Sequence, residues 1–382
     1  MTPRDILARF QTRQDIILRS IREIVEIESP SHFVDGSLAS VAWIKDRLSR
    51  IPSAFDVECV PADGLGEHLV VRAFPGAEKP VLLLGHTDTV HPVGTNLSNP
   101  TRIEGDRFFG CGIFDMKANI VLILEALQYF AEHNIAPAGP ISILLSCDEE
   151  VGSPTGRPLV EQEAAAAKCC YVLEPSFNGS VKTARKGTGL YTVKAHGVPA
   201  HAGLEPENGA SAIVELARQI GRISDLNDPS RGTSVNVTTV KGGTTSNVIP
   251  EHAECEIDVR FTSVAEGERI GAEIDGIHPQ DGRVSLKVLG GINRPPLERT
   301  DAVADLFENA KSIAAKFDYE LSETQVGGAS DGNFVGALGV PVLDGLGVAG
   351  AGAHTLNEYI NIGDIAKRAT LLTLMLTSLN GE

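Results

Sequence analysis

The fold is decided by the stretch Ile141–Gly152, which reads Ile-Ser-Ile-Leu-Leu-Ser-Cys-Asp-Glu-Glu-Val-Gly. A short apolar run bounded by chain breakers predicts a buried strand. Open α/β sheets place their binding sites at the carboxyl ends of such strands. Three adjacent carboxylates, Asp148, Glu149 and Glu150, repel one another there unless a cation or protons intervene. An acidic turn in contact with water is the alternative interpretation of this triplet taken alone.

Two other predicted strands end in the same way. Val81–Gly85 is followed by His86 and Asp88, whose spacing turns both side chains to one side of an extended chain. The imidazole could then face a metal ion while the carboxylate orients the ring, or Asp88 could simply cap a turn. The run Cys170–Leu173 stops at Glu174. Parallel strands share one sheet edge, so these side chains are expected to meet.

A glycine-rich segment, Phe109–Lys117, carries a further carboxylate, Asp115, just before a predicted helix over 118–132. Asp is a good helix N-cap, and that is one interpretation of the residue. The other is a carboxylate that bridges two metal ions. Near the C-terminus, His354 lies in a second glycine-rich segment. Imidazoles and carboxylates in such a mixture suit zinc.

Composition excludes several classes of protein. The 382 residues are 42% hydrophobic and 22% charged, as in globular proteins with two or three domains. The net charge of −17 argues against nucleic acid and anionic membranes as partners. No apolar run approaches the ~20 residues of a membrane span, and no signal peptide is visible. The six cysteines have no framework spacing, which predicts buried thiols in the cytoplasm, although a mature periplasmic chain would look the same.

The pattern of elements predicts two domains, one of them split. One amphipathic helix is expected over 3–28, and strands alternate with helices from 55 to 175, which indicates an α/β sheet with crossovers. Residues 186–295 follow the order β-α-β-β-α-β with alternating strands, which predicts an inserted two-layer α+β domain. The segment 293–296 is expected to be the linker back to the first domain. The expected domains are therefore 1–185 with 296–382, and 186–295.

With these motifs in view, the sequence resembles the dinuclear zinc exopeptidases and deacylases, which include glutamate carboxypeptidase, acetylornithine deacetylase, succinyl-diaminopimelate desuccinylase and aminoacylase. Any one motif is weak, but eight occur in order along nearly the whole chain. They are Gly-His-Thr-Asp-Thr-Val (85–90), Gly-Ile-Phe-Asp-Met-Lys (112–117), Asp-Glu-Glu-Val-Gly-Ser (148–153), Leu-Glu-Pro (173–175), Ala-His-Ala-Gly (200–203), Asn-Val-Ile-Pro (247–250), Gly-Gly-Ala-Ser-Asp-Gly (327–332) and the His354 segment.

The resemblance implies two zinc ions per subunit, with cobalt or manganese as substitutes. It makes Asp115 the bridging ligand between them. One ion would also be held by His86 and Glu174, and the other by Glu150 and His354. Glu149 would be the general base, because Glu150 cannot take a proton while it binds metal, and Asp88 would orient His86.

The resemblance also implies roles for residues in and around the inserted domain. His201 would reach the active site of a neighbouring subunit and steady an oxyanion, which implies a homodimer. Asn247 would touch the substrate or the oxyanion. Arg260 would hold a substrate carboxylate with its two-pronged guanidinium, Arg294 would be a second carboxylate partner, and Gly328 would lie in a substrate-binding loop. Without the resemblance these would be ordinary turn and surface residues.

The sequence thus predicts an α/β fold, a zinc-exopeptidase-like catalytic domain with an inserted two-layer α+β dimerisation domain. The expected function is cytoplasmic hydrolysis of the amide bond to a C-terminal, glutamate-like amino acid in a small peptide or N-acyl amino acid. The spellings Asp-Glu-Glu, Leu-Glu-Pro and Glu358-Tyr359 favour this branch of the family. An N-acyl-amino-acid deacylase is the alternative, although Cys-Gly-Ile-Phe before Asp115 departs from the deacetylases. A metal-free binding protein on the same fold is disfavoured by the intact ligand set.

Overall fold

The three strands that end in candidate ligands lie side by side in one sheet of the computed structural model, which describes residues 1–377. The strand order is β1-β2-β6-β3-β7-β14, and β6, β3, β7 and β14 run parallel. The strands are β1 (Phe55–Ala62), β2 (Gly66–Ala73), β3 (Val81–His86), β6 (Ile141–Ser146), β7 (Cys169–Val172) and β14 (Val342–Leu343). Only β1 and β2 depart from the predicted crossovers, because the three residues between them permit only an antiparallel hairpin.

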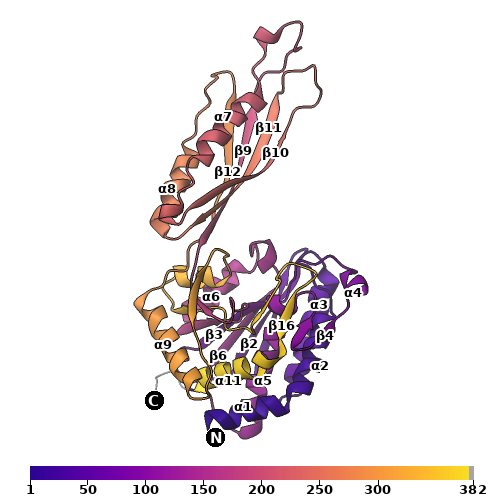
Figure 1. Cartoon of the computed structure of the whole chain (residues 1–382), viewed down its shortest axis with the longest axis vertical. Coiled ribbons are helices and arrows are strands. Elements are labelled where there is room, and N and C mark those ends of the chain that lie inside the picture. The colour runs from indigo at the N-terminus through magenta and orange to yellow at the C-terminus, as the bar shows by residue number, and fades with distance from the viewer. Residues whose placement is uncertain (378–382) are drawn as a thin grey trace. The chain divides into compact units, whose positions relative to one another are not determined.

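Helices cover both faces of this sheet, as its uniformly buried strands require. One core joins Leu83 and Ile143 to α1 (Pro3–Thr12), α2 (Gln14–Val25), α3 (Val34–Ser49), α5 (Ala118–His133), α9 (Asp301–Ala315) and α11 (Ile362–Thr377). The alternate residues Leu82 and Leu144 are also buried, and the neighbouring strands contact α6 (Arg157–Ala166) and α10 (Gly332–Ala337). A short helix, α4, spans Thr95–Ser98. Figure 1 shows α5 and α11 next to each other below the sheet.

The predicted single helix over 3–28 is wrong: α1 and α2 are separated at Arg13, whose backbone leaves the helical region. The guanidinium of Arg13 instead makes two hydrogen bonds, of 2.7 and 2.9 Å, to the carboxylate of Glu125 in α5. The two helices bury separate faces, with Phe10 in α1 and Ile21 in α2. A local pattern of apolar residues could not show this break, because its anchor lies more than a hundred residues away.

The sequence patterns did not predict two small sheets. One has the order β15-β16-β5-β4 and consists of β4 (Arg102–Glu104), β5 (Arg107–Phe109), β15 (Gly350–Ala351) and β16 (Tyr359–Asn361). The other pairs β8 (Val181–Arg185) with β13 (Glu323–Val326). Most of these strands have too few residues for alternation to be visible. The antiparallel pairing of β16 with β5 nevertheless ties the C-terminal segment to the start of the glycine-rich segment that carries Asp115.

The chain divides into two compact units. The first comprises residues 1–184, 299–326 and the segment from Ser330 onward, and the second comprises Arg185–Glu298 with Gly327–Ala329. The predicted segments broke instead at 185/186 and 295/296. Residues 293–294, expected in a linker, are in fact the end of a strand, β12 (Ser285–Arg294), because Arg294 pairs with Thr188.

The second unit has two layers. Its antiparallel sheet has the order β10-β11-β9-β12, formed by β9 (Gly187–His196), β10 (Ser234–Gly242), β11 (His252–Phe261) and β12. The helices α7 (Ala212–Ser224) and α8 (Val264–Asp275) lie along one face (Figure 1). Val193 and Cys255 point into the core beneath them, while Lys194 and Glu254 on the alternate positions face outward. This alternation is the one that the sequence displays.

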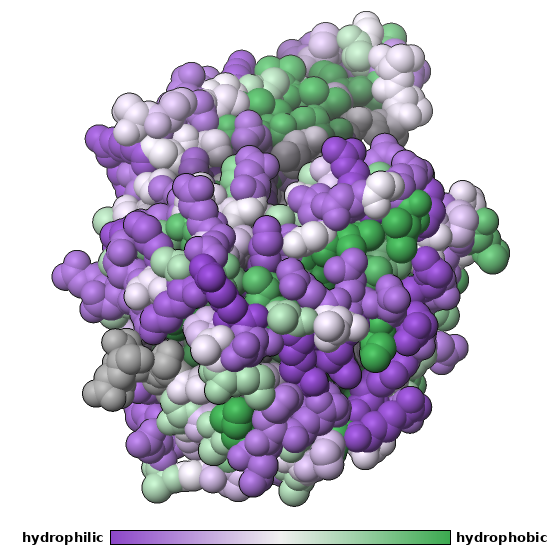
Figure 2. Space-filling model, turned by 60° about the horizontal axis from the view of Figure 1, so that its bottom comes forward, coloured by the Kyte–Doolittle hydropathy of each residue, from purple (hydrophilic) through white to green (hydrophobic). Residues whose placement is uncertain are grey.

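The surface is predominantly polar on the side shown in Figure 2, and its exposed hydrophobic side chains form separate patches. Within residues 1–377, none of the helices combines the length and apolar character needed to cross a membrane. All six cysteines are free and five of them are buried, in agreement with the prediction of buried thiols.

Candidate metal centre

The carboxyl ends of β6, β3 and β7 lie level with one another. Leu84 in β3 pairs with Leu144 on one side and with Val172 on the other, so the residues that follow these strands leave the sheet at one edge. His86 ends β3, the acid triplet follows β6 and Glu174 follows β7. Sequence reasoning predicted this shared edge from three apolar runs with similar endings, and the parallel register produces it.

Asp115 lies between two imidazoles. Its Oδ1 is 3.1 Å from Nε2 of His86, and its Oδ2 is 3.5 Å from Nε2 of His354. A further carboxylate approaches each of these same nitrogen atoms: Glu174 Oε1 is 3.4 Å from Nε2 of His86, and Glu150 Oε2 is 3.2 Å from Nε2 of His354. The five residues expected to bind metal are therefore gathered in one cluster, with one carboxylate common to both halves.

Glu149 belongs to the same cluster. Its carboxylate lies within 4.8 Å of potential ligand atoms of His86 and Glu174, and His86, Asp115 and Glu150 form a second such group. Glu149 and Glu150 start a short 3-10 turn, Glu149–Val151, whose tight backbone sends the two adjacent side chains in different directions.

Asp88 connects the two strand ends. Nδ1 of His86 lies 3.0 Å from the backbone oxygen of Asp88 and 3.3 Å from its Oδ1. The same carboxylate accepts hydrogen bonds from the backbone N–H groups of Glu149 (3.2 Å) and Glu150 (3.1 Å) and from the hydroxyl of Ser31 (2.7 Å). One buried acid thus orients the His86 ring and the turn that carries both glutamates.

The backbone around Asp115 is held by a residue that sequence reasoning did not place in the site. The buried carboxylate of Glu358 accepts hydrogen bonds from the N–H groups of Gly112 (2.9 Å), Phe114 (2.8 Å) and Asp115 (2.9 Å). His91 Nε2 lies 3.0 Å from the same carboxylate. No local pattern marks Glu358 for this task, because its partners lie more than two hundred residues earlier in the chain.

Close packing fixes the Asp115 turn further. Asp115 lies in the turn Ile113–Lys117, where the backbone of Asp115 and Met116 is not helical and the peptide bond between them is cis. The Met116 side chain fills the space next to Gly85, where an added Cβ would come within 2.4 Å of its Cε atom. A larger residue at position 85 would therefore require the Met116 side chain to move. Lys117 is buried and donates to the backbone oxygen of Ile27, and burial lowers the pKa of Lys117 to about 7.

His354 lies in the connection between β15 and β16. The chain reverses through Gly352 and His354, both with positive φ, of 83° and 65°. A hydrogen bond of 2.9 Å from the N–H of Thr355 to the backbone oxygen of Gly352 closes this turn. The N–H of Gly110 donates to the backbone oxygen of Glu358, which docks the connection against the Asp115 segment. The missed small sheet is thus the element that brings His354 to Asp115.

The third acid of the triplet has a structural role. Asp148 is fully buried, and its Oδ2 accepts hydrogen bonds from the N–H groups of Thr155 (2.7 Å) and Gly156 (3.0 Å). It therefore secures the loop that follows the 3-10 turn, and only two of the three adjacent acids reach the cluster.

The cluster perturbs its own protonation. Burial alone would lower the pKa of His86, but hydrogen bonds to Asp115, Asp88 and Glu174 raise it well above its usual value. The carboxylates of Asp115 and Glu150 raise the pKa of His354 to about 10. Burial raises the pKa of Glu150. Burial alone would raise the pKa of Asp115. The pKa nevertheless falls below its usual value, because His354 and His86 favour the ionised acid.

The donor set fits divalent metal ions. Two imidazoles and several carboxylates are the mixed nitrogen and oxygen ligands that zinc takes. Glu150 Oε1 is buried without a hydrogen-bond partner, and a buried carboxylate oxygen of this kind is costly unless a cation or proton neutralises it. The residues present therefore match a metal centre better than a hydrogen-bonded acidic cluster.

His201 and Asn247 belong to the second unit and lie on neighbouring segments. The N–H of Ala202 donates to the backbone oxygen of Asn247 at 2.9 Å. The His201 ring is exposed, and its Nδ1 accepts hydrogen bonds from the N–H groups of Gly203 and Leu204, both at 3.1 Å. Because Nδ1 accepts two hydrogen bonds, the ring proton of His201 is on Nε2. The Nε2–H group is therefore a donor on the side of the ring away from Gly203 and Leu204.

Arg260 and Arg294 flank Thr188. Each is the register partner of Thr188, from β11 and from β12, so the two arginines stand in one row across the second unit's sheet. Arg260 makes two hydrogen bonds to Asp258, of 2.9 and 2.7 Å, and a third of 3.1 Å to the Thr188 hydroxyl. Its two-pronged guanidinium therefore already holds a carboxylate of this chain. Arg294 is buried at the end of β12.

Gly328 lies in the loop Gly327–Ala329, which groups with the second unit although the flanking chain belongs to the first. Its backbone oxygen accepts a 3.2 Å hydrogen bond from Arg185. An added Cβ at Gly328 would meet no heavy atom within 4 Å, so packing within the chain does not require glycine there.

Comparison with known proteins identifies a family. The model of "Peptidase family M20/M25/M40" matches residues 82–378. Carboxypeptidase G2 from Pseudomonas sp. (strain RS-16) is 28% identical over 377 residues, covering 96% of this chain and 90% of that protein. Succinyl-diaminopimelate desuccinylase from Cupriavidus taiwanensis is 30% identical over 351 residues, covering 84% of this chain and 88% of that protein.

Solved structures share the fold. Aminopeptidase PepT from Bacillus cereus superposes with a TM-score of 0.76 at 24% identity, covering 95% of this chain and 98% of that one. The M20 family metallo-carboxypeptidase Sso-CP2 from Sulfolobus solfataricus has a TM-score of 0.73 at 16% identity, with 95% and 99% coverage. At these identities the superpositions speak for the fold alone.

Proposed function

Because this chain belongs to the M20/M25/M40 peptidase family and is a metal-dependent hydrolase, we propose that it is a zinc exopeptidase that cleaves the amide bond to a C-terminal, glutamate-like amino acid. The observation that carries the proposal is the cluster in which Asp115 lies between His86 and His354. The extent of the match to carboxypeptidase G2, 96% of this chain, supports the choice of reaction.

We assign two zinc ions to the cluster. Asp115 would be the ligand common to both, His86 and Glu174 would complete one set, and Glu150 and His354 would complete the other. Bound there, the ions supply Lewis-acid polarisation of a carbonyl and activation of water. Three ligand carboxylates and the neighbouring Glu149 carry four negative charges, which balance two dications. Cobalt or manganese would substitute, since both accept imidazole and carboxylate ligands.

Glu149 is the proposed general base. It takes a proton from the attacking water and later passes it to the leaving amine nitrogen. Glu149 suits this task because its carboxylate is in the cluster while its neighbour Glu150 faces His354. Asp88 positions both by accepting their backbone N–H groups and by holding the His86 ring.

The second unit is proposed to recognise the substrate and to form a homodimer. His201 offers an Nε2–H donor for the oxyanion in a neighbouring subunit, since its Nδ1 already accepts two backbone hydrogen bonds. Asn247, which lies on the adjoining segment, is proposed to contact the same oxyanion. Arg260 and Arg294, with the Gly328 loop, are proposed to receive the substrate carboxylate, and Arg260 would exchange Asp258 for it.

A deacylase that removes the acyl group from an N-acyl amino acid is supported equally well. The relative at 30% identity is a succinyl-diaminopimelate desuccinylase, and both reactions hydrolyse the same kind of bond with the same centre. They differ in which side of the amide the protein recognises.

One panel of substrates separates the two. Glutamate-terminated peptides and N-aroyl glutamates are compared with N-acetyl and N-succinyl amino acids, on protein stripped with a chelator and then restored with zinc. We expect hydrolysis only after restoration and the highest kcat/KM on substrates with C-terminal glutamate. A preference for the N-succinyl or N-acetyl compounds would select the deacylase, and no hydrolysis of any of them would refute both.

A further inference from the structure

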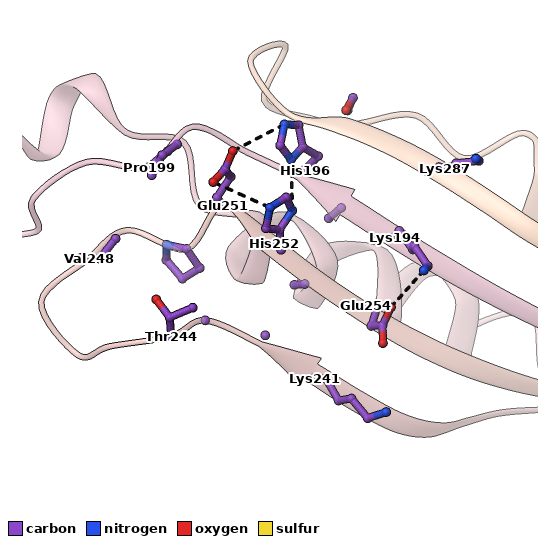
Figure 3. Close-up of a pocket in the computed structure, with 16 residues that line it drawn as sticks. Lys194, His196, Pro199, Lys241, Thr244, Val248, Glu251, His252, Glu254 and Lys287 are labelled. Atoms are coloured by element: carbon purple, nitrogen blue, oxygen red, sulfur yellow. Dashed lines mark hydrogen bonds and ion pairs between the residues drawn. The ribbon is translucent and has the colours of Figure 1, made fainter.

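A second group of metal-ligating side chains lies on the sheet of the second unit (Figure 3). His196 is the last residue of β9, and His252 is the first residue of β11. The two residues are directly opposite in the antiparallel register, so their side chains project from the same face. Glu251 precedes His252 and brings a carboxylate to the same place.

The three side chains converge. Nδ1 of His196 and Nδ1 of His252 are 3.1 Å apart, and the rings stack with their centroids 4.8 Å apart. Glu251 lies against both, with Oε1 3.7 Å from Nε2 of His196 and Oε2 3.7 Å from Nε2 of His252. The dashed lines in Figure 3 show this carboxylate reaching both rings. The three side chains thus form one group, in which one potential ligand atom of each lies within 4.8 Å of the others.

The nitrogen pair is spaced for a metal ion. Two imidazole nitrogen atoms 3.1 Å apart cannot both present a bare lone pair to each other, so either a proton carried by one of them or a metal ion lies between them. Two zinc–nitrogen bonds of about 2.0–2.1 Å span this separation at an angle of about 100°, close to a tetrahedral one. The exposed rings can turn about χ2 at little cost to direct both lone pairs to one point.

The site is open to ions in solution. It lies in a surface hollow of about 660 Å³, and the side chains of His196 and His252 are 56% and 73% exposed. Lys194, Lys241 and Lys287 line the same hollow further along the strands (Figure 3). Hard cations depend on several carboxylates, and this group of three side chains has only one, so imidazole ligation of a softer dication is the main attraction.

We propose that His196, His252 and Glu251 bind one transition-metal dication of the zinc, nickel or copper class. The two imidazoles and the carboxylate supply the protein ligands, and water fills the remaining positions. The ligand set shares no residue with the candidate centre of the first unit, so it adds one ion to those that the family chemistry requires.

The test counts ions on the full chain. Protein stripped with a chelator is dialysed against zinc, and bound zinc is measured for the native chain, His196→Ala, His252→Ala and the control His278→Ala, which removes another exposed histidine of the same unit. We expect the first two variants to bind one zinc fewer per chain than the native protein, and His278→Ala to bind the same number. An equal number in all four would overturn the proposal.

Two further measurements make the result specific. Copper added to the stripped native chain should give an electron paramagnetic resonance signal with nitrogen coupling that loses one component in His196→Ala. Magnesium in place of zinc should leave no difference between the native chain and the variants. A copper spectrum unchanged by the substitution, or a magnesium difference equal to that of zinc, would contradict an imidazole site. Circular dichroism verifies that each variant is folded, as expected for such exposed positions.

Discussion

Replacing Glu358 by glutamine tests whether one buried carboxylate holds the backbone around Asp115. Its Oε1 accepts hydrogen bonds from the N–H groups of Phe114 and Asp115, and its Oε2 accepts one from Gly112 and lies 3.0 Å from His91. A glutamine has one acceptor oxygen and one donor NH₂ group. The amide can keep the first pair of hydrogen bonds, but its NH₂ group would then face the N–H of Gly112.

The magnitude follows from the contacts that are lost. Glu358 is 1% exposed, so water cannot replace them. Hydrogen bonds to a charged group contribute about 1.5–3 kcal/mol each, and an unpaired buried donor costs about 1–3 kcal/mol. Losing the charged contacts with Gly112 and His91 should therefore destabilise the first unit by about 3–6 kcal/mol. Asp115 should also become less well positioned, so the variant should retain zinc less tightly.

Two assays measure these effects. The first is unfolding in urea, monitored by circular dichroism, and the second is retention of zinc against a competing chelator. Glu320→Gln, at an exposed position, is the matched control and should behave as the native chain. Glu358→Asp should be intermediate, because it keeps the charge and shortens the reach. If Glu358→Gln unfolded at the native urea concentration and kept zinc as tightly, the carboxylate would have no such role.

Three other outcomes are expected. Glu149→Gln should keep its zinc while kcat falls by about 10²–10⁴, the usual contribution of a general base, and a near-native kcat would refute that assignment. Removing metal with a chelator should abolish hydrolysis and lower the thermal midpoint, because ions that bind only the folded chain stabilise it, and zinc but not magnesium should restore both; equal recovery with magnesium would contradict the ligand chemistry. Hydrogen bonds with Cys111 and Glu358 raise the pKa of His91 to about 9, so its stabilisation is complete below pH 6.5 and is lost as the pH rises through 9. Between these limits the native chain should lose up to about 3 kcal/mol of stability relative to His91→Gln, and parallel pH profiles would exclude the effect.

Local sequence patterns predicted much of the architecture. Uniform apolar runs marked β3, β6 and β7 because strands covered on both faces need apolar residues at every position, and alternation marked β9 and β11 because one face of their sheet meets water. The residue types at the strand ends indicated a metal centre, since imidazoles and carboxylates together are ligands that zinc accepts. The family resemblance rested on the same local motifs.

Other features depended on contacts between distant segments. The break at Arg13 follows from Glu125, the position of His354 follows from pairing of three-residue strands, and the role of Glu358 follows from N–H groups far earlier in the chain. The row of Arg260, Thr188 and Arg294 and the meeting of His196 with His252 follow from strand register.

Sequence by itself therefore determined which segments are buried and which side chains can bind metal, because burial and ligand chemistry are properties of each residue and its near neighbours. Only the tertiary structure decided which of these residues meet. Strand register and the hydrogen bonds of buried carboxylates join positions that no periodicity relates, and these contacts distinguish Asp148, which secures a loop, from Glu149 and Glu150, which reach the cluster.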